Sequence, residues 1–215
     1  MQTAHLGLIY LDEMSVEPFD EFSKAVKHPA LELKQIARPN PGPYAALEWL
    51  IPTAVFVYIG KSYFDGFLKE AGKDHYLLLK KGIKALTSKY IGPSAASVTL
   101  IFSKGKAASQ TPKYSMLFSV VAELRPGLSL KLLLEPTLTP EQCGKAIELF
   151  MELLTSIHGP DLETISGGGL GEAKPVGGFL LVAFDPLSDE LEVVDPLPKH
   201  VRDAQAIRKG GADEP

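Results

Sequence analysis

A run of alternating apolar and polar residues between positions 116 and 134 constrains the fold more than any other feature of the sequence. Side chains alternate between the two faces of a strand, so this pattern predicts two strands that each bury one face. The residues between them, Arg125-Pro126-Gly127, are typical of a tight turn. A slip of one residue would move every apolar side chain to the wrong face, which makes the register predictable. The predicted pairs are Leu124 with Leu128, Ala122 with Leu130, Val120 with Leu132 and Phe118 with Leu134.

Two further segments with strand character lie on either side of this hairpin. The segment 97–103 (SVTLIFS) also has a period of two and predicts a strand with Val98, Leu100 and Phe102 on one face. Residues 178–184 (GFLLVAF) and 190–195 (ELEVVD) are joined by a polar turn and predict a second hairpin. Its predicted register pairs Phe184 with Leu191 and Val182 with Val193.

The N-terminal region reads as a strand, a helix and a second strand. Residues 5–11 form a short apolar run, and Phe19, Phe22 and Val26 follow at helical spacing after Pro18. A second strand is expected before Pro39, where prolines end regular structure. This order is compatible with a small βαβ unit.

Helical signals dominate the remaining regions. Residues 53–71 follow Pro52, which suits the first turn of a helix, and residues 74–90 carry an apolar stripe at helical spacing. Gly72 lies where a left-handed C-cap residue belongs, so the two helices are predicted to form an αα-hairpin. A third helix is predicted to begin after Thr139 and to end at His158.

These elements together predict a single α+β domain over residues 1–200. In it, an antiparallel sheet made of the two hairpins and the N-terminal strands packs against the αα-hairpin and the further long helix. The chain has 215 residues, of which 45% are hydrophobic, and can therefore build a sizeable core. The polar segment 201–215 is predicted to be a disordered tail.

The uncharged run from Trp49 to Gly60 is the most apolar part of the chain. It has twelve residues, too few for a membrane-spanning helix, which needs about 20. Two interpretations remain: the run is buried in the protein's own core, or part of it docks on a partner or a membrane surface beside the lysines of the next helix. The interaction candidates are Val55, Phe56, Tyr58, Tyr63, Lys80, Lys81 and Lys84.

The reactive side chains do not form a recognisable catalytic pattern. Cys143 shares a spacing of four and three residues with Ile147, Phe150, Leu154 and Ile157, which predicts a buried thiol on the apolar stripe of a helix. The five histidines are scattered, and none lies three or four residues from another histidine or a cysteine. No metal site and no cofactor are predicted.

Two loops are candidates for anion binding. Lys104, Lys106 and Lys113 occur in one segment without an intervening acidic residue, and such a basic loop can bind phosphate. The glycine-rich loop from Gly167 to Gly178 resembles a phosphate cradle in composition. It follows a helix and precedes a strand, however, which is the reverse of the order that places phosphate at a helix N-terminus. We therefore expect it to be a surface loop.

The bulk composition narrows the classes of function. With 22 basic and 26 acidic residues the net charge is −4, and no nucleic-acid binding is indicated. The single cysteine and the absence of a signal-like N-terminus predict a cytoplasmic protein. The leading hypothesis is a non-catalytic intracellular binding or accessory protein with a protein partner. The alternatives are an enzyme acting on a small or phosphorylated molecule near the Gly167–Gly178 loop, and a peripheral membrane protein docking through residues 53–90.

Overall fold

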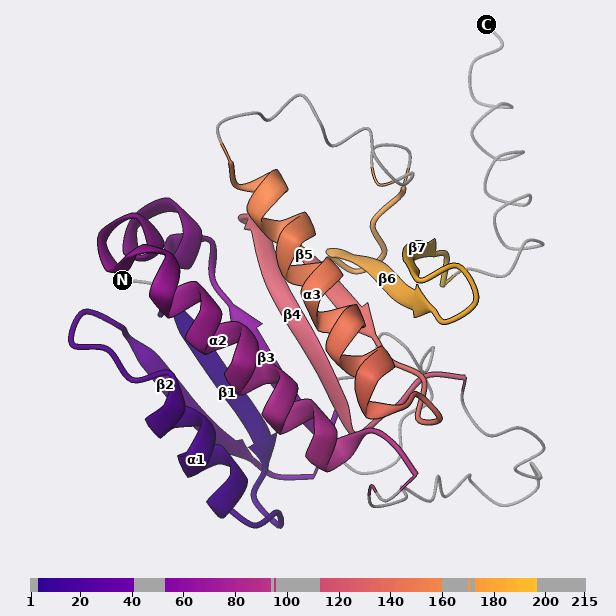
Figure 1. Cartoon of the computed structure of the whole chain (residues 1–215), viewed down its shortest axis with the longest axis horizontal. Coiled ribbons are helices and arrows are strands. Elements are labelled where there is room, and N and C mark those ends of the chain that lie inside the picture. Colours follow the sequence, from indigo (N-terminus) through magenta and orange to yellow (C-terminus); the bar gives the residue numbers. More distant parts are fainter. Residues whose placement is uncertain are drawn as a thin grey trace, which may run out of the picture.

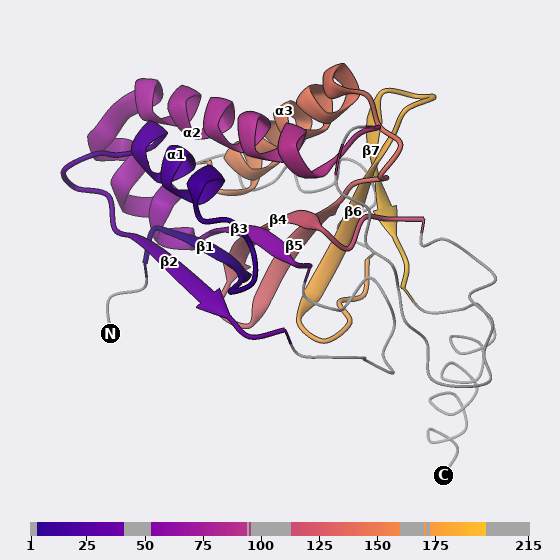
Figure 2. The same cartoon turned by 90° about the horizontal axis from the view of Figure 1, so that it is seen from below.

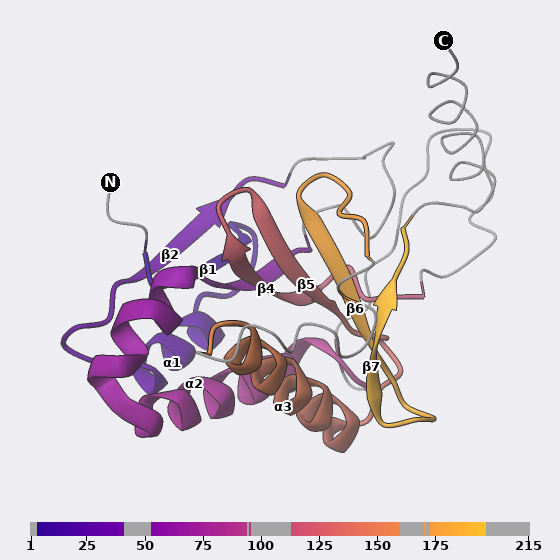
Figure 3. The same ribbon diagram turned by 90° about the horizontal axis from the view of Figure 1, so that it is seen from above.

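The fold is a seven-stranded sheet with its helices on one side. The computed structural model of the chain describes residues 4–40, 53–93, 95, 113–159, 170 and 173–196. The strands have the order β2-β1-β3-β4-β5-β6-β7 across the sheet (Figure 1). Figures 2 and 3 show that α1, α2 and α3 all lie on the same side of this sheet. The elements, in chain order, are β1 (Leu6–Leu11), α1 (Glu17–Ala25), β2 (Leu33–Arg38), β3 (Val55–Ile59), the π-helix η2 (Tyr63–Phe67), α2 (Leu68–Tyr90), β4 (Phe118–Arg125), β5 (Leu128–Leu133), α3 (Pro140–Ile157), β6 (Phe179–Asp185) and β7 (Glu190–Val194).

The sheet is mixed, so the prediction of an antiparallel sheet is wrong. β1 with β2, β3 with β4 and β5 with β6 are parallel pairs, whereas β1 with β3, β4 with β5 and β6 with β7 are antiparallel. Each parallel pair is connected through a helix, as parallel neighbours require a crossover. The mixture of helices and strands and the N-terminal βαβ unit are confirmed.

Residues 55–59 form a strand, which corrects the predicted helix over 53–71. Val55, Val57 and Ile59 are fully buried against the helices, while Phe56 and Tyr58 point to the other face. A short run of β-branched and aromatic residues suits a strand, and periodicity alone does not separate such a run from a buried helix. The proline before it was therefore a misleading helix signal.

The predicted αα-hairpin is not confirmed. η2 leads directly into α2, and Gly72 lies inside that helix with φ 76° and ψ −178°. This backbone conformation interrupts the helix, and the chain then resumes helical structure up to Tyr90. Gly72 breaks the helix, but its ψ of −178° differs from the left-handed C-cap predicted, and the break is a kink instead of a hairpin.

Gly72→Ala is expected to lower the free energy of unfolding by about 1–3 kcal/mol, because this region of φ and ψ is open almost only to glycine. An added Cβ would meet no atom within 4 Å, so the cost would come from the backbone alone. Gly66→Ala is the matched control, since its added Cβ is equally unobstructed and its φ is not in the positive range. Urea denaturation of both variants measures the difference. An equal stability of the two variants would contradict the strained conformation at Gly72.

The predicted hairpin registers are largely correct. Both β6–β7 pairs, Phe184 with Leu191 and Val182 with Val193, are confirmed. In the β4–β5 hairpin, the Ala122–Leu130 and Val120–Leu132 pairs are confirmed. The Leu124–Leu128 pair is wrong, because a register shift between Glu123 and Arg125 places Arg125 opposite Leu128. Leu134 lies beyond the end of β5, so its predicted pairing with Phe118 is not part of the ladder.

The core lies between the sheet and the helices. α3 follows its prediction closely: Thr139 and Gln142 form a capping box, and the stripe from Cys143 to Ile157 is buried. The predicted strand at 98–102 and the tail 201–215 lie outside the described residues. Of the helices in the described part of the chain, none is long and apolar enough to cross a membrane.

Candidate functional site

An apolar row crosses three strands on the face of the sheet that faces away from the helices. Ile9 of β1 pairs with Ile36 of β2 on one side and with Phe56 of β3 on the other, so the three side chains lie in line. Ile9 and Phe56 are half-buried, and Ile36 at the sheet edge is 48% exposed. α1, α2 and α3 cover the opposite face (Figure 2), and the row is most exposed at its β2 end, at Ile36.

Arg38 contacts the Phe56 end of this row. Its guanidinium carbon lies 5.8 Å from the ring centroid of Phe56, a cation–π distance. Its Nη2 also donates to the carbonyl oxygen of Thr53 at 2.5 Å. The charge of Arg38 is thus fixed next to the apolar row and gives it a cationic border.

A second polar contact lies beside the row, at Tyr58. Its hydroxyl donates to Glu123 Oε2 at 3.0 Å, and the same oxygen accepts the Lys61 N–H at 3.2 Å. Burial, followed by the hydrogen bond and the charge of Glu123, raises the pKa of Tyr58 to about 12. Gly7 pairs with Tyr58, and a Cβ at Gly7 would lie 3.3 Å from the Cβ of Tyr58, so the glycine leaves room for the ring. Tyr58 is therefore a neutral, oriented side chain.

The aromatic and aliphatic interaction candidates fall into two groups. Val55 and Tyr63 are completely buried in the core on the helix side of the sheet. Phe56 and Tyr58 are half-buried on the opposite face, next to the row described above. Only Phe56 and Tyr58 are thus placed where a partner can reach them without opening the core.

The lysine candidates on α2 do not form one patch. Lys80 and Lys84 lie 3.7 Å and 2.7 Å from the same oxygen of Glu148 on α3, and these contacts lower the pKa of Glu148. Lys81 is exposed on the outer side of α2. Two of the three lysines therefore connect helices of this protein. Leu77 and Leu78, 54% and 45% exposed, are on the same helix, but no observation indicates what would cover them.

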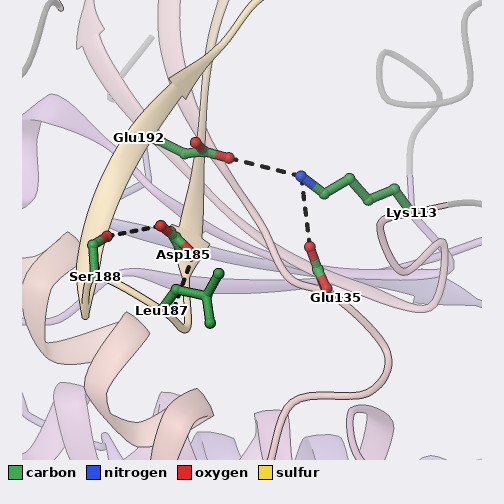
Figure 4. Close-up of polar contacts among 6 residues, drawn as sticks. All are labelled: Lys113, Glu135, Asp185, Leu187, Ser188 and Glu192. Carbon is green, nitrogen blue, oxygen red and sulfur yellow. Dashed lines mark hydrogen bonds and ion pairs between the residues drawn. The ribbon is translucent and has the colours of Figure 1, made fainter.

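Lys113 lies between two carboxylates, as Figure 4 shows. Its Nζ is 3.6 Å from Glu135 and 3.8 Å from Glu192, so an anion bound here would lie close to two carboxylates. In the nearby β6–β7 turn, Asp185 accepts hydrogen bonds from the Leu187 N–H and the Ser188 hydroxyl, which lower its pKa. The other two anion-binding candidates, Lys104 and Lys106, lie outside the described residues.

The glycine-rich loop has a structural role at its C-terminal end. Gly177 and Gly178 have positive φ, and a Cβ at Gly178 would come within 2.9 Å of the Gly127 carbonyl oxygen. The Gly178 carbonyl accepts the Ser129 N–H at 2.9 Å, which aligns β6 with β5. These two glycines are explained by close backbone packing; residues 160–169 lie outside the described part.

Four histidines from separate parts of the chain surround η2, a cluster that their sequence spacing does not show. His5 precedes β1, His28 follows α1, His75 lies in α2, and His158 is the C-cap residue of α3. In the part of the chain that the structure describes, no group of histidine, cysteine and acidic side chains is arranged to hold a metal ion. The ring-centroid distances are 5.3 Å for His5–Phe67, 5.3 Å for His28–Phe67, 4.7 Å for His75–Phe67 and 4.6 Å for His158–Phe64.

His75 is the most constrained member of this histidine cluster. Its Nε2 lies 2.8 Å from the Val26 carbonyl oxygen, and its Nδ1 lies 3.0 Å from the Tyr63 hydroxyl. A carbonyl only accepts, so Nε2 donates, and Nδ1 of the neutral ring accepts from Tyr63. Burial lowers the pKa of His75, partly opposed by the Val26 hydrogen bond. His75 therefore joins α1, η2 and α2 as a neutral hydrogen-bonding group.

Lys131 on β5 is a second feature that sequence reasoning missed. It points away from the helices, where an alternating pattern predicts solvent, but it is only 5% exposed. In the register it lies between Val121 and Leu181, which are also buried. Burial and, to a smaller extent, the charge of Arg38 lower the pKa of Lys131 to about 8.

The thiol of Cys143 is buried as expected, and burial raises its pKa to about 11.

Comparisons with known proteins add no relative: no family model matches the chain, and neither the curated proteins nor the solved structures contain a significant match.

Proposed function

We propose that this chain is a non-catalytic accessory protein that binds a protein partner on the face of β2, β1 and β3 that is opposite the helices. The observation that carries the proposal is the Ile36–Ile9–Phe56 row, which runs to the sheet edge and ends in a 48% exposed isoleucine. Exposed apolar surface bordered by polar groups is typical of protein interaction sites. The face also presents an oriented tyrosine and an arginine, the side chains most enriched at interface hot spots.

The charges around the row indicate what the partner carries. Lys34 and Arg38 are two residues before and after Ile36 and therefore lie on the same face of β2. Lys34 is paired with Glu32 at 3.1 Å, but both side chains are substantially exposed, so this ion pair contributes little. A partner with an apolar side chain flanked by acidic ones would complement this surface.

The two alternative functions have less support. The membrane-docking alternative is less supported because residues 55–59 belong to the sheet and because Lys80 and Lys84 are paired with Glu148. For the enzyme alternative, the Gly167–Gly178 loop is described only in part, and Lys113 faces two carboxylates. Both alternatives remain predictions from the sequence.

Site-specific photocrosslinking tests the proposal. A benzoylphenylalanine at position 36 is expected to give one discrete protein adduct in the native cells, whereas the same group at Leu187, which is 95% exposed, gives none. Lys34→Glu should lower the adduct yield at position 36 by about fivefold, because it reverses a charge on the docking face. Lys89→Glu, on α2, is the charge-reversal control.

Three results would contradict the proposal. They are the absence of an adduct at position 36, the same set of adducts at position 187, and an adduct with the mass of a lipid, which would favour membrane docking instead.

A further inference from the structure

The outer edge of β2 presents unpaired backbone groups. The Leu6 N–H donates to the Glu32 carbonyl at 3.1 Å, and the Asp12 N–H donates to the Arg38 carbonyl at 2.9 Å. Both backbone groups of a strand residue point to the same side, and the side alternates along the strand. The backbone N–H and C=O groups of the even-numbered residues of β2 therefore point toward β1. The backbone groups of Leu33, Gln35 and Ala37 point away from β1, toward the outside of the sheet. Within the described residues, no backbone hydrogen bond joins these outward groups to another segment.

β2 lacks two of the devices that protect an edge strand, a bulge and a proline, although it carries the charged residues Lys34 and Arg38. Its six pairs with β1 continue without a bulge, and residues 34–37 are all exposed. The nearest prolines, Pro29 and Pro39, both lie outside the strand. Natural edge strands are commonly kept short, charged, bulged or interrupted by proline, because an open edge is a template for pairing with another chain. A regular, exposed edge next to the proposed docking face is thus suited to accept a strand.

The two faces of the edge differ in chemistry. On the helix side, the Gln35 amide donates to Ser23 Oγ at 2.8 Å and to Asp20 Oδ1 at 3.4 Å. The part of α1 that lies over the edge strand therefore presents polar side chains to it. The side chains of Lys34, Ile36 and Arg38 lie on the face opposite the helices. A strand added here would carry small polar side chains under α1 and an acidic–apolar–acidic series on the opposite face.

We infer that β2 binds the partner by strand addition, and that the added segment is an extended peptide with alternating acidic and apolar residues on one face. This inference rests on the proposed function and specifies its binding mode. Main-chain hydrogen bonds to Leu33, Gln35 and Ala37 supply part of the affinity, and the side chains opposite Lys34 and Ile36 supply specificity. The Arg38 guanidinium reaches inward to Thr53 and Phe56, so it adds positive charge near the edge and no direct contact with the added strand. Charge complementarity favours this peptide over a second copy of the chain, whose β2 would bring two further cations to the same edge.

A defined peptide and amide hydrogen exchange test the inference on the full chain. The probe is the capped peptide Thr-Glu-Thr-Ile-Thr-Glu-Thr, whose palindromic sequence permits parallel or antiparallel pairing. In the free protein, the amides of Lys34 and Ile36 should exchange slowly and those of Gln35 and Ala37 quickly. Excess peptide is expected to slow exchange at Gln35 and Ala37 by about tenfold or more, because these amides acquire acceptors. The control peptide replaces both glutamates with lysines and should leave exchange unchanged.

The outcomes separate this inference from the proposed function. If the glutamate peptide shifts the resonances of Ile36 and Phe56 but leaves exchange at Gln35 and Ala37 fast, docking on the face stands and strand addition is overturned. Equal protection by the lysine peptide would overturn the acidic specificity. Protection that grows with protein concentration without peptide would identify a second copy as the occupant and overturn the inference. The absence of a crosslinked protein at position 36 would instead contradict the proposed function, that is, partner binding on this face.

Discussion

Tyr63→Ala is expected to lower the free energy of unfolding by about 3–5 kcal/mol, the range for removing a large aromatic side chain from a packed core. Tyr63 is completely buried, and its ring centroid lies 5.2 Å from that of Phe64 and 5.4 Å from that of Phe67. Its hydroxyl is hydrogen-bonded to His75 Nδ1 at 3.0 Å. The substitution therefore leaves a cavity and removes the donor that His75 uses.

Tyr63→Phe separates these two effects. It keeps the ring and removes only the hydroxyl, so the expected loss is about 1–2 kcal/mol. Urea denaturation of both variants at neutral pH provides the comparison. A loss for Tyr63→Ala no larger than that for Tyr63→Phe would show that the ring is not packed in the core, and would restore Tyr63 as a candidate for partner contact.

The elements that were predicted correctly carry their own local signals. The helix α3 has a capping residue, a proline in its first turn and a continuous apolar stripe. The β6–β7 hairpin has two alternating segments joined by a short turn, which determines its register. In such segments the local preference and the tertiary environment agree, so the sequence alone is sufficient.

The elements that were predicted wrongly depend on distant neighbours. Residues 55–59 become a strand because β1 and β4 pair on its two sides, and these partners are separated from it by tens of residues in the chain. The bulge between Glu123 and Arg125 changes one pair of a register that is otherwise determined by alternation. Tertiary pairing decides such short, ambiguous segments.

The candidate site depends on strand order, which one sequence does not show. The sequence indicates Phe56 and Tyr58 by their apolar character within a predicted helix, and they lie near the proposed surface because they belong to β3. The sequence does not indicate Ile36, since its importance follows from the position of β2 at the sheet edge and from its alignment with Ile9. The histidine cluster arises in the same way from four separate parts of the chain.

The buried amine of Lys131 is expected to make the stability of the protein depend strongly on alkaline pH. Its pKa is lowered from 10.5 to about 8 in the folded state, mainly by burial. Between these two values the unfolded chain binds the proton and the folded chain releases it, so the free energy of unfolding rises with pH. Each pKa unit corresponds to about 1.4 kcal/mol, and the expected rise from pH 8 to pH 10.5 is therefore about 3 kcal/mol. Below pH 8 the amine is charged in both states, and the cost of burying the charge is fully present.

Lys131→Met removes the titrating group while it keeps a long apolar side chain between Val121 and Leu181. We expect this variant to lose most of the rise in stability between pH 8 and pH 10.5 that the parent chain shows. Urea denaturation at several pH values across this interval measures the difference, and Lys69→Met, at an exposed position of α2, controls for the loss of one positive charge. Parallel pH profiles for the parent chain and Lys131→Met would mean that the amine reaches solvent. The face opposite the helices would then be open to solvent as far as β5, and the docking surface would extend well beyond Ile36, Ile9 and Phe56.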